Sequence, residues 1–155
     1  MRHLPLIVLL IATLLSCNVP QAGQNAQAPE MEVINLVDPW PYPFSSAVRV
    51  GHMLYLSGQV GTRIVDGTPQ LVAGGIDAEA RQTMENIREI LEHSGSSMDR
   101  IVKCMVMMAD MSEWPRLNEI YASYFPGPKP ARSAWGAAGL ALGARVEITC
   151  FATVG

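Results

Sequence analysis

Apolar residues follow two different periods along this chain. Residues 77–94 and 112–124 place apolar side chains on one helical face, and we expect a helix in each segment. Shorter apolar or alternating segments are expected to be strands. These expected strands are 33–37, 47–50, 53–57, 101–109, 133–136 and 145–154. The order β-β-β-α-β-α-β-β predicts an α+β fold, a mixed sheet with two helices on one face.

Polar residues and glycines at the helix boundaries predict where each helix begins and ends. Asp77 is expected to cap the first helix, and Gly95 to end it. Ser112 is expected to cap the second helix, and Pro115 is acceptable in its first turn because no hydrogen bond is lost there.

The last expected strand has two different faces. Val146, Ile148, Cys150 and Ala152 alternate with polar or larger residues, so this small apolar set is expected to face the helices. Glu147 then lies on the opposite face, among too many apolar neighbours for that face to stay exposed. We expect a second copy of the chain to cover it, which puts Glu147 near a subunit interface.

The N-terminus predicts export. Residues 1–16 combine Arg2 with an apolar run that is shorter than the roughly 20 residues of a membrane-spanning helix, as in a signal peptide. The sequence Leu-Leu-Ser-Cys that ends at Cys17 resembles the lipobox of bacterial lipoproteins, whose cysteine is lipidated. Ordinary secretion after cleavage at a nearby small residue is the alternative. We expect a lipoprotein that is anchored to a membrane and faces the periplasm.

The remaining sequence divides into a tether and one domain. Residues 17–30 are polar and uncharged up to Pro29, which indicates a flexible tether, and residues 31–155 form a domain of ordinary size. The formal net charge of −3 argues against a nucleic-acid partner. Cys104 and Cys150 lie in apolar segments, where buried thiols are favoured and a disulfide is the alternative. No Cys/His cluster has the spacing of a zinc site, so we expect no metal.

Two residues near the C-terminus carry candidate chemistry. Arg132, in a rigid Pro-Ala-Arg-Ser turn before an expected strand, could clamp a carboxylate through two parallel hydrogen bonds. Glu147, inside the following strand, could accept a proton or activate water. A surface salt bridge between the two is the alternative explanation, and such a pair would stabilise the fold little.

Six motifs occur in order along the domain and together resemble the RidA (YjgF) family of reactive-intermediate deaminases. They are residues 43–47, 56–59, 81–86, 117–121, 130–133 and 146–148. The resemblance implies a chorismate-mutase-like fold, assembled as a homotrimer with a cleft at each subunit boundary. It also implies hydrolysis of 2-imino and enamino acids to 2-oxo acids and ammonia, without a cofactor.

The resemblance also assigns roles to residues. It implies that Arg132 binds the substrate carboxylate, that Glu147 positions or activates water, and that Phe44, Ser57 and Asn118 line the cleft. Without it, Ser57 could form a turn, Asn118 could be a solvated helix position, and Phe44 could be a core residue.

This chain departs from the family pattern at several positions. Phe44 stands where a tyrosine is frequent, Ala134 where many members carry cysteine, and Thr149 where a second glutamate is frequent. Trp135 is bulkier than the usual residue and is expected to narrow the pocket. Pyridoxal-phosphate enzymes that release enamines are mostly cytosolic, whereas this chain is expected to be exported. A trimer that binds a small carboxylate without turnover is the alternative function. An endoribonuclease role, sometimes attached to the family, is disfavoured by the acidic charge balance.

Overall fold

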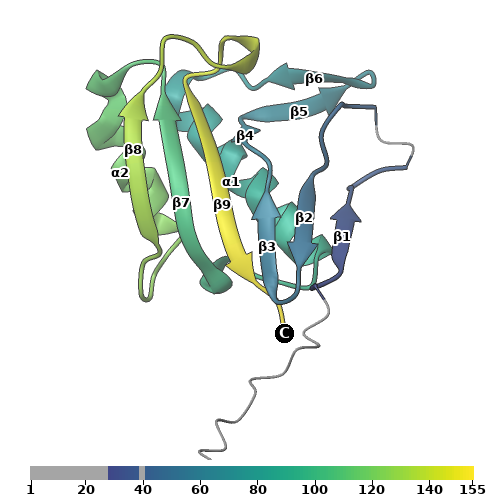
Figure 1. Ribbon diagram of the computed structural model, residues 1–155. Coiled ribbons are helices and arrows are strands. Elements are labelled where there is room, and N and C mark those ends of the chain that lie inside the picture. The colour runs from purple at the N-terminus through teal and green to yellow at the C-terminus, as the bar shows by residue number, and fades with distance from the viewer. Residues whose placement is uncertain (1–27, 39–40) are drawn as a thin grey trace, which may run out of the picture.

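The computed structural model describes residues 28–38 and 41–155, which form one mixed sheet, a small hairpin and two α-helices (Figure 1). The strands are β1 (Met31–Ile34), β2 (Ala47–Val50), β3 (Met53–Leu56), β4 (Gln59–Val60), β5 (Thr62–Val65), β6 (Thr68–Leu71), β7 (Ile101–Met108), β8 (Ala131–Gly136) and β9 (Val146–Thr153). The helices are α1 (Gly75–His93) and α2 (Trp114–Ser123).

The main sheet has the strand order β1-β2-β3-β9-β7-β8, and β4 pairs with the end of β9 that lies beyond β3. All neighbours are antiparallel except β7 and β8, which run parallel because α2 connects them. Figure 1 shows both helices on the same side of the sheet. The predicted α+β class with two helices on one face is confirmed.

The core lies between the sheet and the two helices. Alternate residues of β9 are fully buried there, from Val146 to Ala152, as their spacing predicted. Cys104 and Cys150 lie directly opposite each other in the β7–β9 ladder, with their Cα atoms 4.2 Å apart. A disulfide joins them, whereas the sequence favoured two buried thiols.

Two expected helix caps are wrong. The helix α1 begins two residues before Asp77, and its N-cap is Gly74, whose φ of 119° is available to glycine without strain. The Asp77 carboxylate instead pairs with Arg116 of α2. Ser112 does not cap α2 either. Its amide donates to the Asp110 carboxylate at 2.8 Å, and Asp110 is the N-cap of a 3₁₀ turn that ends just before Trp114. Gly95 ends α1 as expected, with a φ of 73°.

The sheet surface that faces away from the helices, the open face, is mostly apolar. The pairing registers place on it Met31, Val33, Val48, Val50, Met53, Tyr55, Met105, Met107, Trp135 and Phe151. Tyr55 is 44% exposed and Trp135 is 42% exposed in the single chain. A monomer in water rarely leaves so continuous an apolar surface uncovered, so the expectation of a covering partner gains support.

Several predictions fall outside the described residues. They are the prediction of a signal peptide over residues 1–16, the prediction of lipidation at Cys17 and the prediction of a tether up to residue 27. Within residues 28–38 and 41–155, no helix has the length and apolar character needed to cross a membrane.

Candidate functional site

Arg132 lies inside β8 and points toward α2. The sequence placed it in a turn before the strand, but parallel pairing with β7 begins at Ala131 and sets Arg132 beside Cys104 on the helix-covered face. Its Nη2 donates to the Oδ1 of Asn118 at 2.7 Å. The sequence-predicted pair Arg132 and Asn118 is therefore brought together directly.

Two aromatic rings of α2 also hold the guanidinium. Its Cζ lies 4.5 Å from the ring centre of Trp114 and 4.7 Å from that of Tyr121. Both contacts are within the range of cation–π attraction. Among the described residues, no acidic side chain forms an ion pair with Arg132. We call Arg132, Asn118, Trp114 and Tyr121 the arginine half-site.

The Tyr121 hydroxyl is the one buried side-chain polar atom without a hydrogen-bond partner in the described part of the chain. Burial raises the pKa of this phenol to about 12, although the positive charge of Arg132 acts in the opposite direction. Tyr121 is therefore a neutral phenol at physiological pH. It can pack against the guanidinium or donate a hydrogen bond, but it cannot act as a base.

Glu147 lies on β9 and points to the open face. It pairs in register with Val60 of β4 on one side and with Met107 of β7 on the other. Its carboxylate sits directly over Gly58, because a Cβ atom at that glycine would lie 2.0 Å from Glu147 Oε1. Only glycine permits this close approach.

Ser57 and Phe44 belong to the chain segments next to Gly58. The Ser57 hydroxyl donates to the carbonyl of Ser45 at 2.6 Å, and its amide donates to the carbonyl of Ser46. Both bonds fasten the loop that carries Phe44 to the end of β3. The Phe44 ring is 52% exposed and stacks on Tyr42, so it is not a core residue. We call Glu147, Gly58, Ser57 and Phe44 the glutamate half-site.

The two half-sites do not meet within one chain. Arg132 and Glu147 project from opposite faces of the sheet, and β7 lies between their strands. They form no salt bridge with each other, so the alternative explanation offered by the sequence does not apply. A site that uses both groups has to combine them from two copies of the chain.

Trp135 lies on the open face of the sheet, as Glu147 does. It pairs with Met107, the residue that also pairs with Glu147, whereas Arg132 and Ala134 share the helix-covered face. The bulk of Trp135 therefore does not narrow the space beside Arg132. Its indole contributes to the open face.

A comparison with family models gives a match over residues 39–154 to the family described as Endoribonuclease L-PSP. The chain belongs to this family. The match spans most of the domain and includes both half-sites. The resemblance to RidA (YjgF) proteins that the motifs indicated is confirmed, since relatives and solved structures with those names are similar to this chain.

Three relatives illustrate membership of the Endoribonuclease L-PSP family. The 2-iminobutanoate/2-iminopropanoate deaminase of Mus musculus is 45% identical over 73% of this chain and 82% of its own length. Reactive Intermediate Deaminase A, chloroplastic, of Arabidopsis thaliana is 38% identical over 72% of this chain and 59% of its own. The protein in the crystal structure of RidA from a Psychrobacter species is 34% identical to this chain. The match covers 83% of this chain and 99% of the RidA chain, with a TM-score of 0.68.

Sequence reasoning missed the aromatic part of the arginine half-site. Trp114 and Tyr121 fall within the helix expected over residues 112–124, but their relation to Arg132 was not foreseen. Together with Asn118 they recur at intervals of four and three residues, so the three form one stripe on α2. In the described part of the chain, no cluster of three or more His, Cys, Asp or Glu side chains is placed to hold a metal ion.

Proposed function

We propose that this protein hydrolyses 2-imino and enamino acids to 2-oxo acids and ammonia. The relatives from mouse and human, 45% and 42% identical, are named 2-iminobutanoate/2-iminopropanoate deaminases. The observation that carries the proposal is the environment of Arg132, which is held by two aromatic rings and Asn118 and has no acidic partner among residues 28–38 and 41–155. A guanidinium fixed in this way offers its remaining donors to a substrate carboxylate.

The reaction follows from the two charged groups. Arg132 grips the carboxylate of the imino acid and so fixes its C2 atom. A water oxygen forms a bond to C2 while the Glu147 carboxylate accepts the water's proton. That proton is returned to the nitrogen, which gives an intermediate with a hydroxyl and an amino group on C2. Glu147 then accepts the hydroxyl proton and passes it to the amino nitrogen, so the C2–N bond breaks and ammonia leaves as the carbonyl forms. Orientation of water and substrate can remove several kcal/mol from the barrier.

A homotrimer would bring the two groups to the same substrate. We infer that the arginine half-site of one protomer meets the glutamate half-site of the next. The apolar open face supports this inference because a second copy of the chain would cover it. The position of Arg132 on β8 supports it as well, since β8 is an edge strand and lies at the boundary of the domain.

The deaminase proposal is tested by trapping the imine. An amino-acid oxidase supplies the imino acid, semicarbazide captures what remains, and the rate at which captured imine falls measures hydrolysis by the purified protein. We expect Arg132→Ala to reduce kcat/KM by about a hundredfold, mostly through KM, because the carboxylate loses its binding partner. Arg81→Ala, which alters an exposed arginine on α1, should leave the rate unchanged.

Equal rates of imine loss with the wild-type protein and with Arg132→Ala would reject the proposed deaminase activity. Binding of a carboxylate ligand without hydrolysis of the imine would favour the alternative function, a non-catalytic trimer. In that case 2-oxobutyrate would bind with an affinity that depends on Arg132, while the captured imine would stay constant even with the wild-type protein.

We further propose that the chain is exported and held at a membrane through a lipid on Cys17. The lipobox-like sequence and the preceding apolar run support this location. The disulfide between Cys104 and Cys150 is compatible with it, because disulfides persist in oxidising compartments.

The anchor is tested by fractionating cells that produce the full chain. We expect the wild-type protein in the membrane fraction and Cys17→Ser in the soluble fraction, because a serine cannot receive the lipid. Cys104→Ser controls for the loss of a cysteine elsewhere in the chain. Continued membrane attachment of Cys17→Ser would contradict the proposal.

A further inference from the structure

Glu79 is a buried carboxylate whose role the proposed reaction does not explain. It lies in the second turn of α1 with 6% of its surface exposed. A charge that is nearly buried normally has a specific partner. Here the partner is a backbone group, because Glu79 Oε2 accepts the amide hydrogen of Arg145 at 2.7 Å.

This hydrogen bond joins α1 to the chain just before β9. The strand β4 pairs with β9 at Gln59 and Val60 and then turns away at Gly61. Just before β9, the carbonyl of Arg145 accepts from the amide of Ala109, next to the end of β7, at 3.0 Å. The Glu79 carboxylate supplies the acceptor for the Arg145 amide, so this amide is not left unpaired.

The backbone of Glu79 also fixes the end of β4. A Cβ atom on Gly61 would lie 2.6 Å from both the Cα and the carbonyl oxygen of Glu79, so the two backbones are in close contact. Farther along α1, Asn86 donates to the carbonyls of Val60 and Thr62, each at 3.0 Å. The helix α1 therefore holds β4 at two points and holds the start of β9 at one.

The side chain of Arg145 is held from another direction. Its Nε lies 2.8 and 2.9 Å from the two carboxylate oxygens of Glu113, and its Nη2 lies 2.5 Å from one of them. Glu113 belongs to the 3₁₀ turn that precedes α2. The residue two positions before Glu147 is thus fixed through its backbone by α1 and through its side chain by this turn.

These contacts bear on the position of Glu147, the candidate for activating water. Glu147 is paired with Val60, and its carboxylate rests on Gly58, so its position depends on how β4 and β9 are aligned. We propose that Glu79 is a positioning residue for Glu147, which keeps the start of β9 against β4 and so keeps the carboxylate directed at the water. This inference rests on the proposed deaminase function.

The test compares two substitutions of Glu79 that differ in the length of the new side chain. Glu79→Gln keeps the length of the side chain and a carbonyl oxygen that can accept from the Arg145 amide. Glu79→Asp keeps the charge but is one methylene too short. Glu89→Asp makes the same change at an exposed position on α1 and serves as the matched control.

We expect Glu79→Asp to lower kcat about tenfold while KM and the affinity for 2-oxobutyrate stay within about twofold of wild type. The carboxylate clamp at Arg132 belongs to the other half-site and is not disturbed. Glu79→Gln and Glu89→Asp should keep most of the wild-type kcat. Unchanged kcat in folded Glu79→Asp, or an equal loss of kcat and of 2-oxobutyrate affinity, would overturn the proposal.

A measurement without turnover separates this inference from the deaminase proposal. In protein with ¹³C-labelled glutamate carboxylates, the resonance of Glu147 is assigned with Glu147→Gln. We expect Glu79→Asp to shift this resonance and Glu79→Gln to leave it close to its wild-type position. Absence of any imine hydrolysis by wild type would reject the deaminase alone, whereas an unmoved Glu147 resonance in Glu79→Asp would reject the positioning role.

Discussion

At the scale of single residues, the environment of Arg132 explains how an arginine on an edge strand can be rigid. Long side chains on edge strands usually keep their rotational freedom, which has to be lost on binding a ligand. Here two aromatic rings and one amide restrict the guanidinium before any ligand arrives. A substrate carboxylate then meets an arginine that is already oriented, which lowers the cost of binding.

The hydroxyl of Tyr121, which has no hydrogen-bond partner in the described part of the chain, gives a prediction at this scale. A buried hydroxyl without a partner loses its hydration and gains no bond in return. Tyr121→Phe keeps the ring against Arg132 and Phe125 and should leave the free energy of unfolding unchanged or raise it by up to about 1 kcal/mol. Chemical denaturation measures this difference, with Tyr124→Phe as the control.

The control differs in one respect. The hydroxyl of Tyr124 donates to the Glu85 carboxylate at 2.8 Å, so its removal should lower the stability. A loss for Tyr121→Phe as large as that for Tyr124→Phe would contradict the prediction.

At the scale of elements, the sequence predicted the helices and long strands but not the segment between β3 and α1. Apolar periodicity revealed α1, α2, β7 and β9 because each buries one face or both. The strands β4, β5 and β6 were missed, since β4 has two residues and the hairpin exposes Ile64 and Val65. Asp66 and Gly67, which turn with φ of 50° and 74°, were the available indication of that hairpin.

The candidate site could be predicted as a set of residues but not as an arrangement. Chemistry and motif resemblance identified Arg132, Asn118 and Glu147. Which face of β8 carries Arg132 depends on its parallel pairing with β7. The expected strand began at Ser133, two residues after the observed start of β8, and so left Arg132 outside it. The positioning residue Glu79 was not foreseen, because its partner is a backbone amide 66 residues away.

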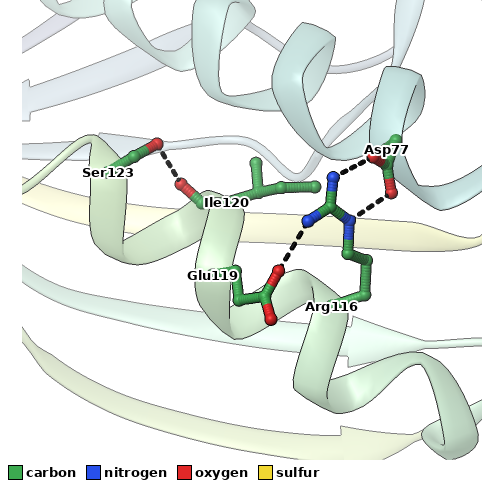
Figure 2. Close-up of polar contacts among 5 residues, drawn as sticks. All are labelled: Asp77, Arg116, Glu119, Ile120 and Ser123. Atoms are coloured by element: carbon green, nitrogen blue, oxygen red, sulfur yellow. Dashed lines mark hydrogen bonds and ion pairs between the residues drawn. The ribbon is translucent and has the colours of Figure 1, made fainter.

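Contact between the two helices gives a prediction about pH. Figure 2 shows Arg116 of α2 between Asp77 of α1 and Glu119 of its own helix. Hydrogen bonds from Arg116 lower the pKa of Asp77 below its ordinary value of 3.8. A carboxylate with a lowered pKa in the folded state stabilises the fold above its unfolded pKa, and this contribution is lost as the pH falls through the folded value.

Arg116→Ala should therefore unfold at a lower temperature than wild type at neutral pH, by a small amount because the pair is exposed. The gap should close as the pH falls below 3.8 and through the lowered pKa of Asp77 in the folded state, because the carboxyl is then protonated in both states. Thermal unfolding across this pH range measures it, and Arg88→Ala, which removes an arginine paired within α1, is the control. A gap that stays constant down to the lowest pH would contradict the assignment.

At the scale of the whole molecule, the sheet separates two groups that the proposed reaction needs together. The arginine half-site lies on the helix-covered face at the β8 edge, and the glutamate half-site lies on the open face near β4. Association of identical chains would cover the apolar open face and would also bring the two half-sites together. Oligomerisation would then complete the site as well as cover the apolar surface.

The most direct test of this account is complementation between two impaired variants at a substrate concentration below the wild-type KM. Under this condition Arg132→Ala is expected to keep about a hundredth of the wild-type rate and Glu147→Gln to lack hydrolysis. The two proteins are unfolded, mixed in equal amounts and refolded together. If each site takes Arg132 from one protomer and Glu147 from the next, about a quarter of the sites contain both native residues, and about a quarter of wild-type turnover should return. A mixture no more active than the separate variants would contradict the shared site.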